Sequence, residues 1–141
     1  MTKKMIIDYE LSDNCIILDT TNDDNYIHKF LNTIDIFLHY RSDGECHSTA
    51  IAQAMIYGKP IVSHRAGYNG QYETIKDGGY VAQSKKDYSE YLSYLIKNKD
   101  FYKIVSEKSK LRGMDFEEDK IVKKWENIYY TLYNNYDSSK S

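Results

Sequence analysis

The chain has 141 residues, which is long enough for one domain with a hydrophobic core. Apolar residues make up 41% of it and charged residues 28%, so its composition is that of a globular protein and not of a disordered chain. The formal net charge is −2, with no block of like charges. This argues against a nucleic-acid or anionic-membrane partner, because both need a basic face.

No segment of the sequence predicts a membrane span or a secretory signal. The apolar runs are only a few residues long, and no long apolar stretch follows Lys3 and Lys4. Cys15 and Cys46 form no C-x-x-C pair, so we expect two reduced thiols. The sequence therefore predicts a soluble, cytoplasmic protein without a transmembrane segment.

The first third of the chain predicts two strands joined by a helix. Residues 1–14 form an N-terminal segment in which Met5–Tyr9 is a candidate edge strand. Cys15–Leu18 is a continuous apolar run, typical of a buried strand. Apolar residues recur at helical spacing over residues 26–34, and Ile36–Leu38 is the next apolar run.

The middle of the chain predicts a helix between strands. Ser48 is a suitable N-cap, Gly58 closes the helix, and Pro60 follows, which is the usual asymmetry of helix ends. Ile61–Val62 then predicts a third strand. A short helix is expected near residues 71–75, and Tyr80–Ala82 is a fourth short strand.

The last third of the chain predicts three helices. Ser84 and Asp87 have capping-box spacing, and the helix after them has an apolar stripe: Tyr88, Tyr91, Leu92 and Leu95. We expect its tyrosine-rich part, from Tyr88 to Tyr94, to be core packing and not a stacking platform. Asp100 opens a second helix, which Gly113 closes. Asp115 and Glu118 form a second capping box, which starts a helix with one apolar face: Ile121, Val122, Trp125, Ile128, Tyr129 and Leu132.

Buried-type strands that alternate with helices predict an α/β fold. We expect a partial Rossmann-like parallel sheet of about four strands, flanked by helices, with a helical C-terminus. The domain is expected over residues 15–134, followed by a flexible tail at 135–141. Cys15–Leu18 is expected to pair in parallel with Ile36–Leu38. The alternative is an exposed sheet edge that recruits another chain. Ligands of such sheets bind at the carboxyl ends of the strands.

The segment Asp43–His64 resembles the core motif of retaining GT-B glycosyltransferases of the family 4 type, in their C-terminal, nucleotide-sugar-binding half. In that motif a strand ends in a loop bearing a Glu, and a second Glu follows eight positions later on a helix. Ala-Met, a Gly-Lys-Pro turn and an apolar strand come next. Residues 34–38 and 72–78 match the flanking family segments, and the resemblance covers roughly residues 15–133.

The resemblance implies a role for each matching residue. Glu45 is implied as the catalytic-site carboxylate, which accepts hydrogen bonds from sugar hydroxyls. His47, Ser48 and Thr49 are implied at the donor diphosphate, where a helix N-terminus favours an anion. Gln53 is implied at the ribose. The nucleotide-sugar donor is the substrate, no cofactor or metal is expected, and the leaving diphosphate itself is usually held to assist retention.

Several positions depart from the family pattern. Gln53 replaces the second Glu and forms no charge-assisted hydrogen bond. His47 and Ser48 stand where the family has an aromatic residue and a Gly. The family's diphosphate-clamping Arg and Lys and its acceptor domain have no counterpart here, so we expect a separate acceptor-binding domain or a homo-oligomer, and an isolated chain that is inactive. The alternative is a degenerate, non-catalytic binding or interaction module.

Three histidines raise a further alternative. His39, His47 and His64 follow predicted strands and are able to converge beside Cys46 and Glu45, which are ligand types for zinc. Their spacing matches no zinc-finger or H-E-x-x-H pattern. We therefore expect hydrogen-bonded histidines at strand ends and no metal site.

Overall fold

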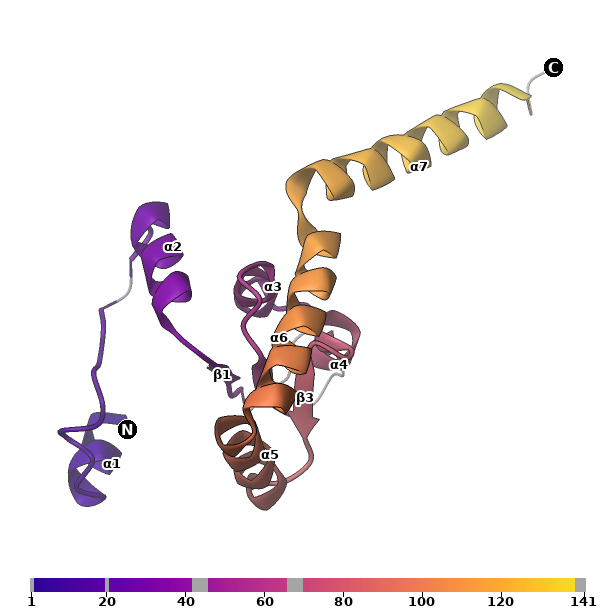
Figure 1. Cartoon of the computed structure of the whole chain (residues 1–141). Helices are drawn as coiled ribbons and strands as arrows, with labels where there is room; N and C mark the ends of the chain where they lie inside the picture. The colour runs from indigo at the N-terminus through magenta and orange to yellow at the C-terminus, as the bar shows by residue number, and fades with distance from the viewer. Residues whose placement is uncertain (1, 20, 42–45, 66–69, 139–141) are drawn as a thin grey trace. The chain divides into compact units, whose positions relative to one another are not determined.

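The computed structural model describes residues 2–19, 21–41, 46–65 and 70–138. It divides into two compact units, Met1–Phe30 and Leu31–Ser141. The first contains helix α1 (Thr2–Asp8) and most of helix α2 (Asp24–Thr33). The second contains the sheet and the remaining helices, coloured from magenta to yellow in Figure 1.

The sheet has three parallel strands in the order β1-β2-β3. They are β1 (Phe37–His39), β2 (Ile61–His64) and β3 (Gly79–Ala82). Phe37 pairs with Ile61, which in turn pairs with Gly79. The predicted α/β class, the parallel sheet and these three strands are confirmed.

Six helical segments complete the second unit. They are α3 (Thr49–Ile56), α4 (Gly70–Ile75), α5 (Lys85–Lys97), α6 (Lys99–Gly113), the 3-10 turn η1 (Met114–Phe116) and α7 (Glu118–Ser138). Helices α3 and α5 contact β2, and α6 lies beside α3 (Figure 1). Each β-strand is joined to the next through a helix, as parallel pairing requires.

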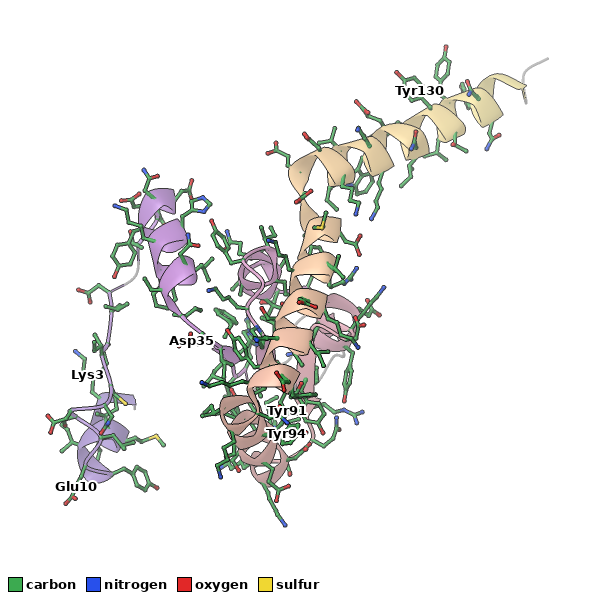
Figure 2. All side chains as sticks on the ribbon, in the orientation of Figure 1. Lys3, Glu10, Asp35, Tyr91, Tyr94 and Tyr130 are labelled. Carbon is green, nitrogen blue, oxygen red and sulfur yellow. The ribbon has the colours of Figure 1, made fainter. Side chains whose placement is uncertain are left out.

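One cluster of the core is built from the sheet, α5 and α6, and α3 adds further buried residues such as Ile51 and Met55. Val62, Leu95 and Val105 are buried together, and half-buried aromatic residues of α5 and α6 pack around them. Tyr88 and Tyr91 belong to this layer, as predicted, whereas Tyr94 on the same helix is exposed, so the prediction of core packing is wrong for Tyr94 (Figure 2). Leu92 and Leu95 of the same apolar stripe also pack in the core.

Two serines of α6 hold the turn that follows α3. Ser106 Oγ donates to the Gly58 carbonyl at 2.7 Å, and Ser109 Oγ donates to the Lys59 carbonyl at 2.6 Å. Gly58 itself has a φ of +68°, a conformation that glycine adopts without a Cβ penalty. The turn after α3 is thus hydrogen-bonded to the middle of α6.

Two predictions for the first unit are wrong. Cys15–Leu18 forms no strand: it has no regular structure, and Ile16 is 88% exposed. Met5–Tyr9 is not an edge strand, because most of it lies in α1. The described sheet begins at Phe37, so the predicted pairing of Cys15–Leu18 with Ile36–Leu38 is also wrong. A short apolar run is compatible with a helix or with a strand, and it forms a strand only where a neighbouring strand supplies the hydrogen-bond partners.

The helix ends in the C-terminal third differ from expectation in three details. Asn98, not Asp100, caps α6, because its side chain accepts the Phe101 N–H at 2.9 Å. Asp115 does not cap α7, because its carboxylate pairs with Arg112 and Lys120. The helix α7 runs to Ser138, beyond the predicted start of the tail at residue 135.

Helix α7 has the predicted apolar residues, but most of them are exposed. Ile121 is half-buried, whereas Trp125 is 54% exposed and Tyr129 is 65% exposed. Tyr130, which Figure 2 labels on the same helix, is exposed as well. None of the helices in the described ranges is both long and apolar enough to cross a bilayer.

Candidate functional site

The N-terminus of α3 is built as the sequence predicts. Ser48 has extended backbone angles, and its Oγ accepts the Ile51 N–H at 3.3 Å, which makes it the N-cap. Ser48 is only 2% exposed, so its hydroxyl lies beneath the surface. The first turn of α3 therefore has one of its free amide donors already occupied by this side chain.

Three of the predicted binding residues line one cavity of about 330 Å³. His47 precedes the cap, and Thr49 and Gln53 are one turn apart on α3, which places them on the same helix face. All three side chains are exposed. The remaining wall is apolar and comes from α3, η1 and the start of α7: Ala52, Ile56, Phe116 and Ile121. Glu45 lies outside the described residues.

His47 is fixed at the edge of this cavity by two contacts. Its Nδ1 lies 3.1 Å from Thr74 Oγ1 on α4. Its ring is tilted against the Phe116 ring, with the centroids 5.5 Å apart. Thr74 is 2% exposed and donates its hydroxyl proton to the Gly70 carbonyl at 2.9 Å.

Arg112 joins the elements behind His47. Its Nε donates to the Thr74 carbonyl at 3.0 Å, and one terminal nitrogen donates to the Glu73 carbonyl at 2.7 Å. The carbonyls at the end of α4 lack intrahelical partners, so these bonds satisfy them. The guanidinium carbon also lies 4.6 Å from the centroid of the Phe116 ring, which is cation–π geometry.

Asp115 completes this network. Its carboxylate accepts from Lys120 at 3.0 Å and from Arg112 at 2.8 Å. These two hydrogen bonds, with the Lys120 bond the larger cause, lower the pKa of Asp115 below its ordinary value. The site thus has a negative charge that is neutralised by two cations at the junction of α6, η1 and α7.

The carboxyl ends of β1 and β2 hold a second set of polar groups. His39 Nδ1 lies 3.3 Å from Ser63 Oγ, as the strand register places them side by side. The Tyr40 and His64 rings are 5.0 Å apart. His64 Nδ1 and Gln71 Nε2 are buried and have no hydrogen-bond partner in the part of the chain that the structure describes. The expectation of hydrogen-bonded histidines holds for His39 and His47 but not for His64 Nδ1.

The three histidines do not assemble with Cys46. Among the described residues, no group of three His, Cys, Asp or Glu side chains is placed to hold a metal ion. Cys46 is free and exposed, and His47 is bound to Thr74 instead. The converging arrangement considered for zinc is therefore absent from the described ranges, which do not include Glu45.

Sequence reasoning missed Thr74, Arg112 and Phe116. Thr74 lies within a segment that matches the family, but nothing in its local pattern shows that it meets a residue 27 positions away. The spacing of Arg112 and Asp115 was the one available signal, since residues three apart on a helix are neighbours.

Comparison with known families gives one match. The sequence model of the family "Glycosyl transferases group 1" matches residues 1–112. This range contains α3, β2, α4 and β3 and therefore includes all five predicted site residues. No curated protein matches the sequence significantly.

Proposed function

Because the chain belongs to the group 1 glycosyl transferases, we propose that it binds a nucleotide-sugar donor at the cavity beside α3, for a retaining transfer of the family 4 type. In this proposal Glu45 accepts hydrogen bonds from the sugar, Thr49 meets the diphosphate at the helix N-terminus, and Gln53 meets the ribose. No cofactor or metal takes part.

The observation that carries the proposal is the shared cavity. The polar residues that line this cavity come from one stretch of sequence: His47, Thr49 and Gln53. The other residues that line the same cavity are apolar. A concave, largely apolar wall with a few convergent polar groups is typical of small-molecule sites. The N-terminus of α3 adds amide donors and a positive dipole end, which favour a diphosphate.

Catalysis in this proposal consists of positioning and charge stabilisation. The protein holds the donor so that the acceptor attacks on the face that the diphosphate leaves, and the helix dipole stabilises the negative charge that develops there. A separate acceptor-binding domain or a second chain supplies the other wall of the site. This wall excludes water from the reacting atoms.

An NMR titration tests the proposal. UDP-, GDP- and ADP-sugars are added to the ¹⁵N-labelled chain, and shifts are expected at residues 46–53 for one of them. Glu45→Ala should weaken that binding, whereas Glu107→Ala, on the exposed surface of α6, should not. Absence of any shift at millimolar ligand, or shifts that Glu45→Ala leaves unchanged, would contradict the assignment.

One observation favours the alternative function, a non-catalytic interaction module. The exposed apolar residues of α7 include a series spaced three and four apart, as in a coiled-coil seam: Val122, Trp125, Tyr129, Leu132 and Tyr136. In this alternative α7 pairs with α7 of a second copy. Analytical ultracentrifugation should then show a dimer that Trp125→Glu dissociates, and a monomer for the unaltered chain would rule this alternative out.

A further inference from the structure

The hydroxyl of Thr74 determines which nitrogen of His47 carries the proton. A carbonyl oxygen only accepts, so the bond of Thr74 Oγ1 to the Gly70 carbonyl uses the single hydroxyl proton. The 3.1 Å contact between Thr74 Oγ1 and His47 Nδ1 is then a hydrogen bond only if Nδ1 donates. Both contacts are satisfied together in one tautomer of neutral His47, with the proton on Nδ1 and a lone pair on Nε2.

Thr74 is held firmly enough to impose this choice. It is 2% exposed, and its carbonyl accepts from Arg112, which is itself bound to Glu73 and Asp115. The hydroxyl oxygen lies closer to the Gly70 carbonyl, at 2.9 Å, than to His47 Nδ1, at 3.1 Å, so its proton is directed to Gly70. The same guanidinium stacks on Phe116, so His47 is bounded by two residues that Arg112 positions.

His47 is exposed and lines the cavity, so its Nε2 is the remaining hydrogen-bonding atom of a ring that faces a ligand space. The Nε2 lone pair accepts a hydrogen bond from a hydroxyl group, whereas it repels the oxygen of an ionised phosphate, which is also only an acceptor. The tautomer therefore argues against the diphosphate contact that the family resemblance implies for His47. His47 suits a hydroxyl-bearing part of a ligand and not its diphosphate.

We propose that Thr74, held by Arg112, is a positioning residue that makes His47 Nε2 the acceptor for a ligand hydroxyl in this cavity. The inference rests on the proposed function for the identity of the ligand, a nucleotide sugar. The hydroxyl belongs either to the ribose or to the transferred sugar. The tautomer itself rests on the geometry of His47, Thr74 and Gly70 alone.

The tautomer is tested without any ligand. Two-bond ¹H–¹⁵N NMR of the full chain at about pH 8.5, well above the ordinary histidine pKa of about 6.5, distinguishes a protonated from an unprotonated ring nitrogen. We expect Nδ1 protonated and Nε2 bare in the unaltered protein and in Thr74→Ser, which keeps the hydroxyl. Thr74→Val removes it and should shift His47 toward the Nε2-protonated form. A proton on Nε2 in the unaltered chain would overturn the inference, even if the Val variant does not fold.

The ligand role is tested with matched probes. The nucleotide base is the one found to bind in the NMR titration. For that base, titrations measure the affinities of pyrophosphate, the nucleoside diphosphate and the nucleotide sugar for the unaltered chain, Thr74→Val and Thr74→Ser. Thr74→Val should weaken hydroxyl-bearing ligands about two- to tenfold, the effect of one hydrogen bond, and leave pyrophosphate binding unchanged. Weakening of both nucleotide ligands identifies the ribose, and weakening of the nucleotide sugar alone identifies the sugar.

The two proposals fail in different ways. If no probe binds at all, the proposed function fails, and the ligand role of His47 fails with it, while the tautomer measurement still decides the role of Thr74. If nucleotide sugars bind but Thr74→Val weakens pyrophosphate equally, or weakens nothing, the proposed function stands and the inference about His47 is wrong.

Discussion

Gly113 at the end of α6 lies against the backbone of Met55 on α3. A Cβ placed on Gly113 would come within 2.5 Å of the carbonyl carbon and oxygen of Met55. The φ of Gly113 is −56°, so the glycine is needed for this close approach and not for an unusual backbone conformation. Helices α3 and α6 are therefore in direct backbone contact at the site.

Gly113→Ala should destabilise the protein by about 1–3 kcal/mol, because the backbones of α3 and α6 must separate to admit the methyl group. Urea denaturation measures the change. The control is Ser93→Ala, at an exposed position inside α5, which should change the stability by no more than about 0.5 kcal/mol. Equal stabilities for Gly113→Ala and the unaltered chain would show that the two helices are not in contact as described.

Ser48 provides a second prediction, on the cap of α3. Ser48→Ala should cost about 1 kcal/mol of stability, because the Ile51 N–H loses its acceptor, while Ser48→Gly should cost only a few tenths. The glycine variant also leaves that amide open to a phosphate oxygen, as in the family pattern. Pyrophosphate should therefore bind Ser48→Gly more tightly than the unaltered chain in a calorimetric titration. Weaker binding would count against a phosphate at this helix end.

The third prediction concerns Gln53. Gln53→Glu restores the carboxylate of the family motif, and a charge-assisted hydrogen bond is about twice as strong as a neutral one. We expect the nucleoside diphosphate to bind this variant more tightly and pyrophosphate, which has no ribose, to gain nothing. Gln53→Ala should weaken the nucleoside diphosphate. If both ligands respond alike to the two changes, Gln53 does not meet the ribose.

The lowered pKa of Asp115 predicts a dependence of stability on pH. The folded state stabilises the ionised carboxylate of Asp115, so its pKa there is below the value of about 3.9 that an Asp has in the unfolded state. The contribution of Asp115 to the free energy of unfolding is therefore fully present above the unfolded-state pKa. It is lost as the pH falls through the lower pKa of the folded state. Asp115→Asn should be less stable than the unaltered chain at pH 7, and the difference should shrink below about pH 4.

Asp77 is the control for this measurement. Its 3.6 Å pair with Lys108 is largely exposed, and such pairs contribute little to stability. Asp77→Asn should therefore change stability much less than Asp115→Asn at pH 7. A pH-independent difference for Asp115→Asn would mean that the carboxylate charge is not what stabilises the folded state.

The fifth prediction concerns activity. If the proposed function holds, the 141-residue chain alone should show no measurable sugar transfer from UDP-, GDP- or ADP-sugars, because the cavity beside α3 has exposed polar residues and needs a second wall to exclude water. A radiolabelled-sugar transfer assay measures this. Robust transfer by a contaminant-free sample would show that the chain supplies both walls.

The sequence predicts α3 and its surroundings well because the signals there are local. Ser48, Gly58 and Pro60 fix the helix ends through hydrogen bonds and backbone conformation within a few residues. The sequence fails for Cys15–Leu18 because a strand requires a partner elsewhere in the chain. The sequence does not predict the roles of Thr74 and Arg112 for the same reason, because these roles arise only from tertiary contacts.

The bonds from Ser106 and Ser109 to the turn after α3 have a thermodynamic consequence. Helix α3 is tied to α6 at this turn and again where Gly113 meets Met55, so neither helix opens without disturbing the other. A ligand that binds at α3 therefore shifts the unfolding equilibrium of the whole sheet-containing unit by mass action. Occupancy of the cavity should register as a raised melting temperature and as slower amide exchange in α6, a helix that supplies none of the residues lining the cavity.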